Sequence, residues 1–259
     1  MSWEGAVCHL SHLVSRARHT VVLTGAGIST ESGIPDYRGG GRYWARYDPE
    51  GLTYARFVAS EPARGNYWRM AREFFTLMRH AQPNAAHRAL AELERRDVLQ
   101  SVLTQNVDGL HQRAGHRADR VLEVHGTAAR IRCLDCDVRI PAEQLYQTLG
   151  DGEVPYCERC SGILKPDVVL FGEPIAPAVA AAATAQVARC DLLLVVGSSL
   201  FVQPFASLPA RAKDGGARLA IVNLSSTPYD ADMDVIVRGL AGEVLPRMVA
   251  NLDADLASV

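Results

Sequence analysis

The sequence predicts an α/β protein with a doubly wound, mainly parallel, Rossmann-like sheet and a smaller domain beside it. Short β-branched apolar runs alternate with segments of helical length along most of the chain. Four of the six cysteines form two C-x-x-C pairs inside a segment that interrupts this alternation. With 259 residues, 48% of them hydrophobic, the chain can bury a core as one large or two unequal domains.

Seven apolar runs predict the strands in order along the chain. They lie in residues 19–27, 97–106, 120–126, 167–173, 190–199, 217–226 and 233–239. An amphipathic helix with Leu10, Leu13, Val14 and Ala17 on one face precedes them, and further helices are expected in residues 84–96, 177–188 and 204–213. This alternation favours parallel strands joined by right-handed crossovers.

Small and polar residues follow nearly every apolar run, as in "TGAGIS", "TQNVDG", "GSS" and "NLSS". The carboxyl ends of parallel strands meet at one edge of a sheet, and ligands of such sheets bind beyond that edge. The sequence therefore predicts a ligand site there.

Two segments depart from the alternation. Residues 39–83 are aromatic, basic and helical in pattern, and residues 130–166 hold the cysteine pairs. We expect them to form the small domain, as a helical insertion and a zinc-binding module. Residues 1–38, 84–129 and 167–259 would then form the discontinuous Rossmann-like domain, with a cleft between the two.

The cysteine pairs predict one structural zinc ion. Cys133, Cys136, Cys157 and Cys160 can place four thiolates around Zn²⁺ from two tight turns. All eight histidines lie at or before His125, so the module offers no mixed ligand set. A closed shell leaves no position for water, and the ion is expected to stabilise the fold only. The two remaining cysteines, Cys8 and Cys190, are expected to be buried thiols.

Composition limits the expected partners and location. The net charge of −2 gives no electrostatic reason to expect nucleic acid or an anionic membrane as the main partner. No apolar run is long enough to span a bilayer, and "MSWEGAVCHLSHLVSRARH" lacks the features of a secretory signal. We therefore expect a cytoplasmic protein.

The stretch "GAGISTESGIPDYRGGG" looks like a cofactor loop but departs from that of the dehydrogenases. Gly25 and Gly27 follow a strand, so the next backbone N–H groups can face a phosphate. The fingerprint G-x-G-x-x-G requires a third glycine where Thr30 stands. Asp36 and Arg38 add fixed charges where a dehydrogenase would continue its helix.

Taken together and in order, the motifs resemble those of the sirtuins, the NAD-dependent protein deacylases. The resemblance rests on "GAGISTESGIPDYR", "TQNVDGLHQRAG", "EVHG", the two C-x-x-C pairs, "LKPDVVLFGE", "GSSL" and "IVNL". It covers essentially the whole chain. The details "PNAAH" and "LKPDVV" are similar to the class II branch, which includes a lipoamidase-type sirtuin.

The resemblance implies a reaction in which NAD is consumed as a co-substrate. Nicotinamide leaves the ribose, the acyl group of a lysine passes to ADP-ribose, and the products are free lysine, nicotinamide and O-acyl-ADP-ribose. His125 of "EVHG" is implied as the general base toward a ribose hydroxyl, a role that suits an imidazole. The implied partners are acylated lysine side chains of proteins.

The resemblance also implies the binding residues. The NAD contacts would be Gly25, Ala26, Gly27, Ile28, Ser29, Asp36, Tyr37, Arg38, Gln105, Asn106, Val107, Asp108, Gly197, Ser198, Ser199, Asn223, Leu224, Ser225 and Ala241. Val168 and Phe171 would pair with an extended substrate peptide by strand addition. Asp108 can be an electrostatic partner of the leaving group or a loop cap. His87 and His111 are expected to serve packing or hydrogen bonding.

Some alternatives stay open at this point. Arg69 and Arg72 have the spacing of the Tyr-x-x-Arg pair that reads acidic acyl groups, but the tyrosine position differs, and we expect these arginines on a solvated helix face. Acetyl-lysine is the expected substrate, with longer or lipoyl chains possible. A mono-ADP-ribosyltransferase, a lipoamidase-type deacylase and an NAD-binding scaffold without turnover are the competing functions, and the intact "TQNVDG" and "EVHG" argue against the scaffold.

Overall fold

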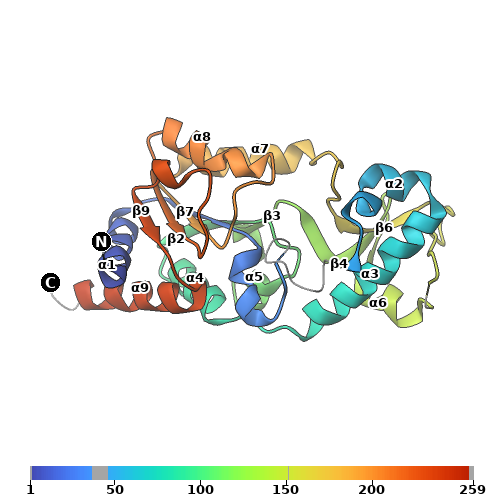
Figure 1. Cartoon of the computed structure of the whole chain (residues 1–259), viewed down its shortest axis with the longest axis horizontal. Coiled ribbons are helices and arrows are strands. Elements are labelled where there is room, and N and C mark those ends of the chain that lie inside the picture. The colour runs from blue at the N-terminus through green and yellow to red at the C-terminus, as the bar shows by residue number, and fades with distance from the viewer. Residues whose placement is uncertain (1, 37–45, 151, 257–259) are drawn as a thin grey trace.

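A six-stranded parallel sheet organises the larger part of the structure, a computed structural model that describes residues 2–36, 46–150 and 152–256 (Figure 1). Its strand order is β3-β2-β1-β7-β8-β9, and every neighbouring pair is parallel. The strands are β1 (Thr20–Thr24), β2 (Leu99–Thr104), β3 (Val121–Glu123), β7 (Leu192–Val196), β8 (Arg218–Val222) and β9 (Val235–Val237). The chain winds outward from β1 to β3 and then returns to β7, so β1 and β7 flank a topological switch point. The expected doubly wound fold is confirmed.

Helices cover both faces of this sheet. α1 (Trp3–Arg16), α4 (Ala85–Arg95) and α9 (Ala241–Leu256) pack on one face, while α7 (Pro177–Arg189) and α8 (Leu208–Asp214) pack on the other, above the strands in Figure 1. In β1, Val22 joins the first core and Val21 and Leu23 join the second, as the two-residue repeat of a strand requires. Burial on both faces explains why these strands are continuous apolar runs.

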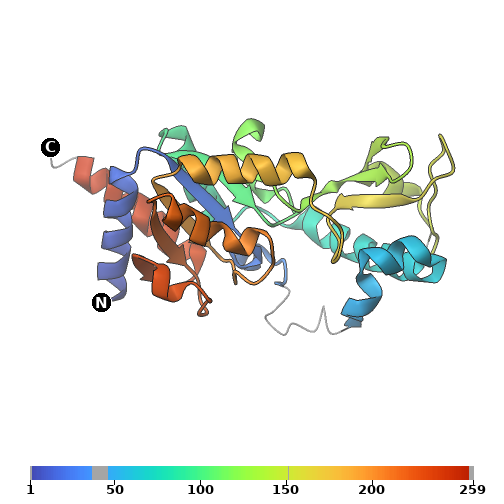
Figure 2. The same ribbon diagram turned by 90° about the horizontal axis from the view of Figure 1, so that it is seen from above.

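A smaller module lies at the other end of the elongated molecule (Figure 2). It contains α2 (Tyr54–Ala59), α3 (Glu61–His80), α6 (Ala142–Thr148) and an antiparallel sheet of order β5-β4-β6. Its strands are β4 (Gly126–Cys133), β5 (Arg139–Pro141) and β6 (Leu164–Val168). Phe57, Trp68 and Ile131 belong to a separate core between these helices and this sheet.

Short elements complete the described chain. α5 (Leu110–Arg113) follows the loop after β2. One-turn 3₁₀ helices span Ala26–Ile28, Thr30–Ser32, Pro49–Leu52, Ala118–Arg120, Phe205–Ser207 and Asp230–Asp232. Among the described residues, no helix is both long and apolar enough to cross a membrane.

A strand was expected in residues 167–173 of the main sheet, but only residues 167 and 168 lie in a strand, β6, and residues 169–173 lie outside it. β6 ends at Val168 and pairs antiparallel with β4 in the small sheet. An apolar run predicts a strand but not its partner, and here the partner begins directly after His125. Gly126 has φ +79°, and a Cβ atom at this position would lie 2.1 Å from the carbonyl oxygen of Asp167, so the close approach of the two strands requires glycine.

The expectation for Cys8 is also wrong, whereas Cys190 is buried as expected. α1 buries Ala6, Val7 and Leu10, and this face leaves position 8 exposed. The same helix period that predicted the apolar face therefore places the Cys8 thiol toward solvent.

Candidate active site

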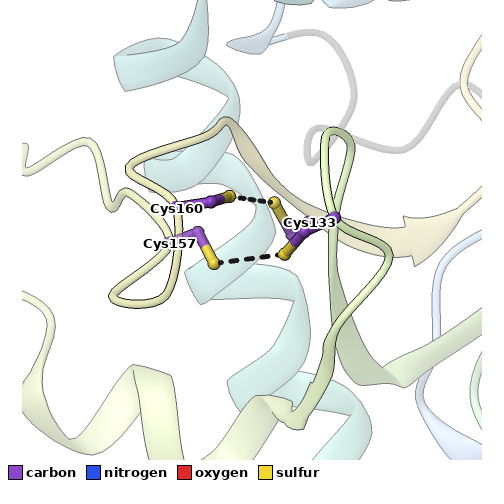
Figure 3. A group of neighbouring side chains, drawn as sticks. Cys133, Cys157 and Cys160 are labelled. Atoms are coloured by element: carbon purple, nitrogen blue, oxygen red, sulfur yellow. Dashed lines mark hydrogen bonds between the residues drawn. The ribbon is translucent and has the colours of Figure 1, made fainter.

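Four cysteine sulfurs converge at the end of the small sheet (Figure 3). The Sγ atoms of Cys133 and Cys160 lie 3.6 Å apart, those of Cys136 and Cys157 lie 3.7 Å apart, and all four lie within 4.8 Å of one another. A disulfide would bring two sulfurs to about 2.05 Å. A zinc tetrahedron with Zn–S bonds of about 2.3 Å has edges of about 3.8 Å. The geometry therefore fits one structural zinc ion, as the sequence predicts.

The two cysteine pairs sit on matching turns. Asp137 donates its N–H to the carbonyl of Cys133, and Ser161 donates to the carbonyl of Cys157. Asp137 and Ser161 both have positive φ, 58° and 59°. Each turn thus closes directly after its second cysteine, which is how both sulfurs of a pair come to face the same point.

A cavity of about 1070 Å³ opens between the carboxyl edge of the main sheet and the small module. The loops after all six strands of the main sheet contribute to it. They supply residues 25–27 and 29–30 after β1, 105–108 after β2, His125 after β3, 197–199 after β7, 223–226 after β8 and 239–241 after β9. The expected convergence of strand ends on one site is present.

The loops after β1 and β7 touch through backbone at the switch point. Gly27 donates its N–H to the carbonyl of Gly197 at 2.8 Å. A Cβ on Gly27 would lie 2.8 Å from the Cα of Gly197, and a Cβ on Gly197 would lie 2.3 Å from the nitrogen of Ile28. The one-turn helix Ala26–Ile28 therefore packs by its backbone on Gly197, and Gly25, Gly27 and Gly197 form a cradle without side chains, which fits the close approach of a dinucleotide pyrophosphate.

A hydrogen-bonded network fixes the loop after β2 against the loop after β1. Ser29 Oγ donates to Asp108 Oδ2 at 2.8 Å, and Asn106 Nδ2 donates to Ser29 Oγ and to the carbonyl of Gly25. Asp108 Oδ1 also accepts the N–H of Leu110, so this side chain does cap the start of α5. Burial raises the pKa of Asp108, and its hydrogen bonds to Leu110 and Ser29 act in the opposite direction. The cap is observed, and the electrostatic role stays a prediction.

His125 lines the cavity with its proton position set by the backbone. Its Nδ1 lies 3.1 Å from the carbonyl oxygen of Gln105. A carbonyl can only accept, so Nδ1 carries the proton and Nε2 is the basic atom of the ring. Burial lowers the pKa of His125, and the hydrogen bond to Gln105 partly offsets this. Phe205 packs edge-on against the imidazole, with 5.5 Å between ring centroids.

Val168 and Phe171 also line the cavity, on a segment that is tied to the neighbouring elements. The N–H of Val169 donates to the carbonyl of His125 at 2.8 Å, and the N–H of Tyr54 donates to the carbonyl of Phe171 at 2.9 Å. Residues 201–203 form a second wall that was not predicted from the sequence, and Phe201 in it is 53% exposed. The aromatic and apolar residues of "SLFVQP", directly after a strand-end loop, are the signal that could have found it.

α3 forms the wall toward the small module, which was not predicted from the sequence either. The residues Tyr67, Met70, Ala71, Phe74, Phe75 and Met78 line the cavity at the spacing of one helix face. Arg69 is exposed, Arg72 is half-buried, and neither lines the cavity. Among the described residues, no lysine or arginine lines it.

Most of the predicted NAD contacts come together in this cavity. It is lined by Gly25, Ala26, Gly27, Ser29, Asp36, Gln105, Asn106, Val107, Asp108, Gly197, Ser198, Ser199, Asn223, Leu224, Ser225 and Ala241. Ile28 differs, because its side chain is fully buried in the main core. Tyr37 and Arg38 lie outside the described residues.

His87 and His111 are buried away from the cavity, with side-chain partners in the fold. His111 Nε2 lies 3.0 Å from Thr24 Oγ1, and His87 Nδ1 lies 3.0 Å from Asn84 Oδ1, the residue that caps α4. The centroids of the two rings are 5.0 Å apart. Both histidines therefore serve packing and hydrogen bonding, as expected from the sequence.

Comparisons with known proteins agree on one family. The Sir2 family model matches residues 25–204. The chain is 43% identical to NAD-dependent protein deacylase 2 of Archaeoglobus fulgidus, over 96% of this chain and 97% of that protein. It is 41% identical to an NAD-dependent protein deacetylase of Thermodesulfovibrio yellowstonii, with 95% and 94% covered.

Solved structures give the same result. A structure described under the mechanism and regulation of Sir2 enzymes superposes with a TM-score of 0.86 at 41% identity, covering 97% of this chain and 99% of that one. A Sir2 homologue in complex with NAD gives 0.87 at 37% identity, with 96% and 94% covered. A Sir2 variant with a deacetylated p53 peptide and 3′-O-acetyl-ADP-ribose gives 0.87 at 35% identity, with 93% and 96% covered.

Proposed function

The chain belongs to the Sir2 family, and we propose that it removes acyl groups from protein lysines in the cavity between its sheet and its small module. It is an NAD-dependent protein deacetylase or deacylase, with NAD as co-substrate and one structural zinc ion. The products are free lysine, nicotinamide and O-acyl-ADP-ribose. The observation that carries the site assignment is the basic Nε2 of His125, held on the wall of the same cavity as a side-chain-free glycine cradle.

Bound NAD supplies the electrophilic ribose carbon and the nicotinamide leaving group. For the residues of this chain, we propose that Gly25, Gly27 and Gly197 receive the pyrophosphate on their backbone. Gln105, Asn106 and Asp108 line the part of the cavity that takes nicotinamide and its ribose, and Asn223, Leu224, Ser225 and Ala241 line the adenosine part. The remaining NAD contacts named from the motifs, Tyr37 and Arg38 included, stay part of the same proposal.

His125 is proposed as the general base. Its Nε2 can accept a proton from a ribose hydroxyl because Nδ1 is held by the Gln105 carbonyl. The neutral imidazole that this role requires is favoured by burial, which lowers its pKa. Val168 and Phe171 are proposed to receive the substrate as an extended peptide beside it.

The division into two domains is also part of the proposal. Residues 1–38, 84–129 and 167–259 would form the NAD-binding domain, and residues 39–83 and 130–166 the small domain. The separate hydrophobic cores of the main sheet and the small module support this division. The substrate would then bind where the two meet.

The acyl group is proposed to be acetyl or a longer apolar chain, lipoyl included. The apolar face of α3 supports this, because it offers carbon surface to the acyl end of a substrate. A succinyl or malonyl carboxylate would find no lysine or arginine among the described lining residues, and burying an unpaired charge is costly.

One incubation tests the function against its alternatives. The protein is mixed with NAD and an acetylated peptide, and nicotinamide, deacetylated peptide and O-acetyl-ADP-ribose are measured over time. Equal amounts of the three are expected, with little nicotinamide when peptide is omitted. ADP-ribose attached to protein without deacetylation would indicate a mono-ADP-ribosyltransferase, and no nicotinamide release with any acyl chain would indicate a scaffold.

A cytoplasmic location stays a proposal. The four free cysteines of the zinc cluster support it, because zinc binds thiolates and the cytosol keeps thiols reduced. Cell fractionation with an antibody to the protein tests it, and recovery in a membrane or extracellular fraction would contradict it.

A further inference from the structure

Lys165 is a buried cation that belongs to no site described so far. It lies on β6, is 1% exposed and does not line the cavity. Its Nζ donates to the carbonyl of Pro166 at 3.0 Å and to the carbonyl of Val168, and it forms an ion pair with Glu173 Oε2 at 3.0 Å. A buried ammonium needs a partner for each of its three N–H groups, and these three acceptors satisfy that need.

Glu173 lies eight residues after Lys165 and contacts the backbone of the residues between them. Its Oε2 accepts the N–H of Leu170 at 2.9 Å, and its own N–H donates to the carbonyl of Leu170. Arg132 Nη2 lies 3.8 Å from Oε1, on the strand paired with β6. Residues 166–173 therefore wrap around one buried ion pair, which holds their backbone near both ends and in the middle.

This wrapped segment is the wall of the cavity next to the base. Residues 168–173 all line the cavity. The N–H of Val169 donates to the carbonyl of His125, and Val168 pairs with Gly126, which directly follows His125 in the chain. A change in the shape of residues 166–173 would thus be felt both by an incoming peptide and by the backbone that carries His125.

We propose that the Lys165–Glu173 ion pair is a positioning element that holds residues 168–173 in the shape that receives the substrate peptide. The inference rests on the proposed function, because it takes this segment as the peptide-binding strand. Strand addition requires an ordered receiving backbone, and a loop that must order on binding weakens affinity.

The contacts of Lys165 and Glu173 indicate that the ion pair affects peptide binding and not NAD binding. The hydrogen bonds and ion pairs described for Lys165 and Glu173 go to residues 166–170, to each other and to Arg132. These partners belong to the small sheet and the wrapped segment, whereas the glycine cradle lies on the loops after β1 and β7. The pair is therefore expected to act on peptide binding and not on NAD binding.

The test compares steady-state kinetics of Lys165→Met, Glu173→Gln and the double variant with those of the wild type, using an acetylated peptide. Each single variant leaves one buried charge without its partner, so the KM for peptide is expected to rise at least about tenfold, while the KM for NAD stays within about twofold. The double variant leaves neither charge unpaired, and its KM for peptide is expected to be no higher than that of either single variant. Lys165→Arg, which keeps the charge, is expected to recover part of the loss.

Lys213→Met is the matched control. Lys213 lies on α8, and its ion pair with Asp232 is exposed. It is expected to match the wild type in both KM values. Zinc content and thermal midpoint are measured for every variant. If Lys165→Met is recovered unfolded, Glu173→Gln, which keeps the side-chain shape, carries the comparison.

Two results would overturn the proposal: an unchanged KM for peptide in folded single variants, or an equal rise in the KM values for peptide and NAD. Failure of the proposed function gives a different result, namely a wild type that releases no nicotinamide with any acylated peptide. In that case direct titration of peptide into the wild type and Lys165→Met still tests the positioning role, and equal affinities would reject it.

Discussion

At the scale of single residues, the proposed role of His125 as general base depends on the backbone around its ring. The carbonyl of Gln105 fixes the proton on Nδ1, and burial keeps the ring neutral by lowering its pKa. Neither effect can be read from "EVHG" alone, since both need the loop after β2 to lie against the strand end after β3.

Replacing His125 by alanine is expected to reduce deacylation about 10²–10⁴-fold, the usual loss when a general base is removed. NAD affinity, measured by calorimetry, should change little, because the glycine cradle does not depend on the imidazole. His12→Ala, on the exposed side of α1, is the control and should match the wild type. A fully active His125→Ala enzyme would show that another group takes the proton.

The pH dependence follows from the lowered pKa of His125. In the proposed role the active form of His125 is the neutral ring, so activity is expected to be lost when the pH falls through its pKa. Because burial lowers that pKa from 6.5, the acid limb of kcat/KM plotted against pH should have its midpoint below 6.5. The profile is recorded with acetylated peptide at saturating NAD, and a midpoint above 6.5 would contradict the assigned environment.

At the scale of elements, the small module contributes a wall of the cavity through α3 and depends on the cysteine cluster for its own stability. α3 presents an apolar face to the cavity, and the cysteine turns hold β4 and β6 together at their far ends. Each of these two elements gives one prediction.

An acyl-chain panel tests the α3 face. Octanoyl-lysine is expected to be processed, whereas succinyl-lysine should have a kcat/KM at least about 100-fold below that of acetyl-lysine, since its carboxylate would be buried without a partner. Phe74→Arg is expected to reduce activity on octanoyl-lysine at least about tenfold, because it places a charge on the apolar wall. Arg69→Ala, on the exposed side of the same helix, serves as the control, and efficient wild-type desuccinylation would refute the prediction.

Removal of zinc is expected to unfold the small module first. Cys157→Ser, or treatment of the wild type with a strong chelator, should lower the thermal midpoint and the folded yield together with the zinc content, because metal binding contributes to folding. Cys8→Ser changes an exposed thiol outside the cluster and should keep its zinc. A zinc-free Cys157→Ser protein with wild-type stability and activity would disprove a structural role.

The elements also show what a sequence can and cannot predict. β1 and β7 are buried on both faces, so their apolar runs predicted strands, and the residues after them predicted the ligand edge. The run at residues 167–173 predicted neither the bounds of β6, which ends at Val168, nor its sheet, because pairing with β4 depends on a contact between distant residues. The α3 wall was missed because an amphipathic face does not reveal whether it meets a core or a cavity. The cysteine spacing succeeded because one ion restricts four ligands at once.

At the scale of the whole molecule, the pH dependence of stability is expected to reflect two buried histidines, His87 on α4 and His111 on α5. Burial, together with the nearby His116, Arg88 and Arg113, lowers the pKa of His87 to about 4, and burial also lowers the pKa of His111. In the unfolded chain both rings would take up a proton near pH 6.5.

Folding stability is therefore expected to fall as the pH is lowered from 6.5 toward 4. In this range the unfolded chain binds protons that the folded protein excludes, which favours unfolding by about 1.4 kcal/mol per pH unit for each such histidine. Urea unfolding across this range measures the slope for the wild type and for His87→Gln. The variant should show a shallower slope, and identical slopes would mean that His87 does not resist protonation in the folded state.

The backbone contact between Gly27 and Gly197 limits which substitutions these two positions can accept. The two main chains meet with no room for even one methyl group, and they follow the two central neighbours of the sheet. An alanine at either position would force the loops after β1 and β7 apart, because its methyl group would clash with backbone atoms of the other loop. The proposed pyrophosphate cradle can thus change only if both loops move together, so we expect selection to retain both glycines while the residues around the cavity vary.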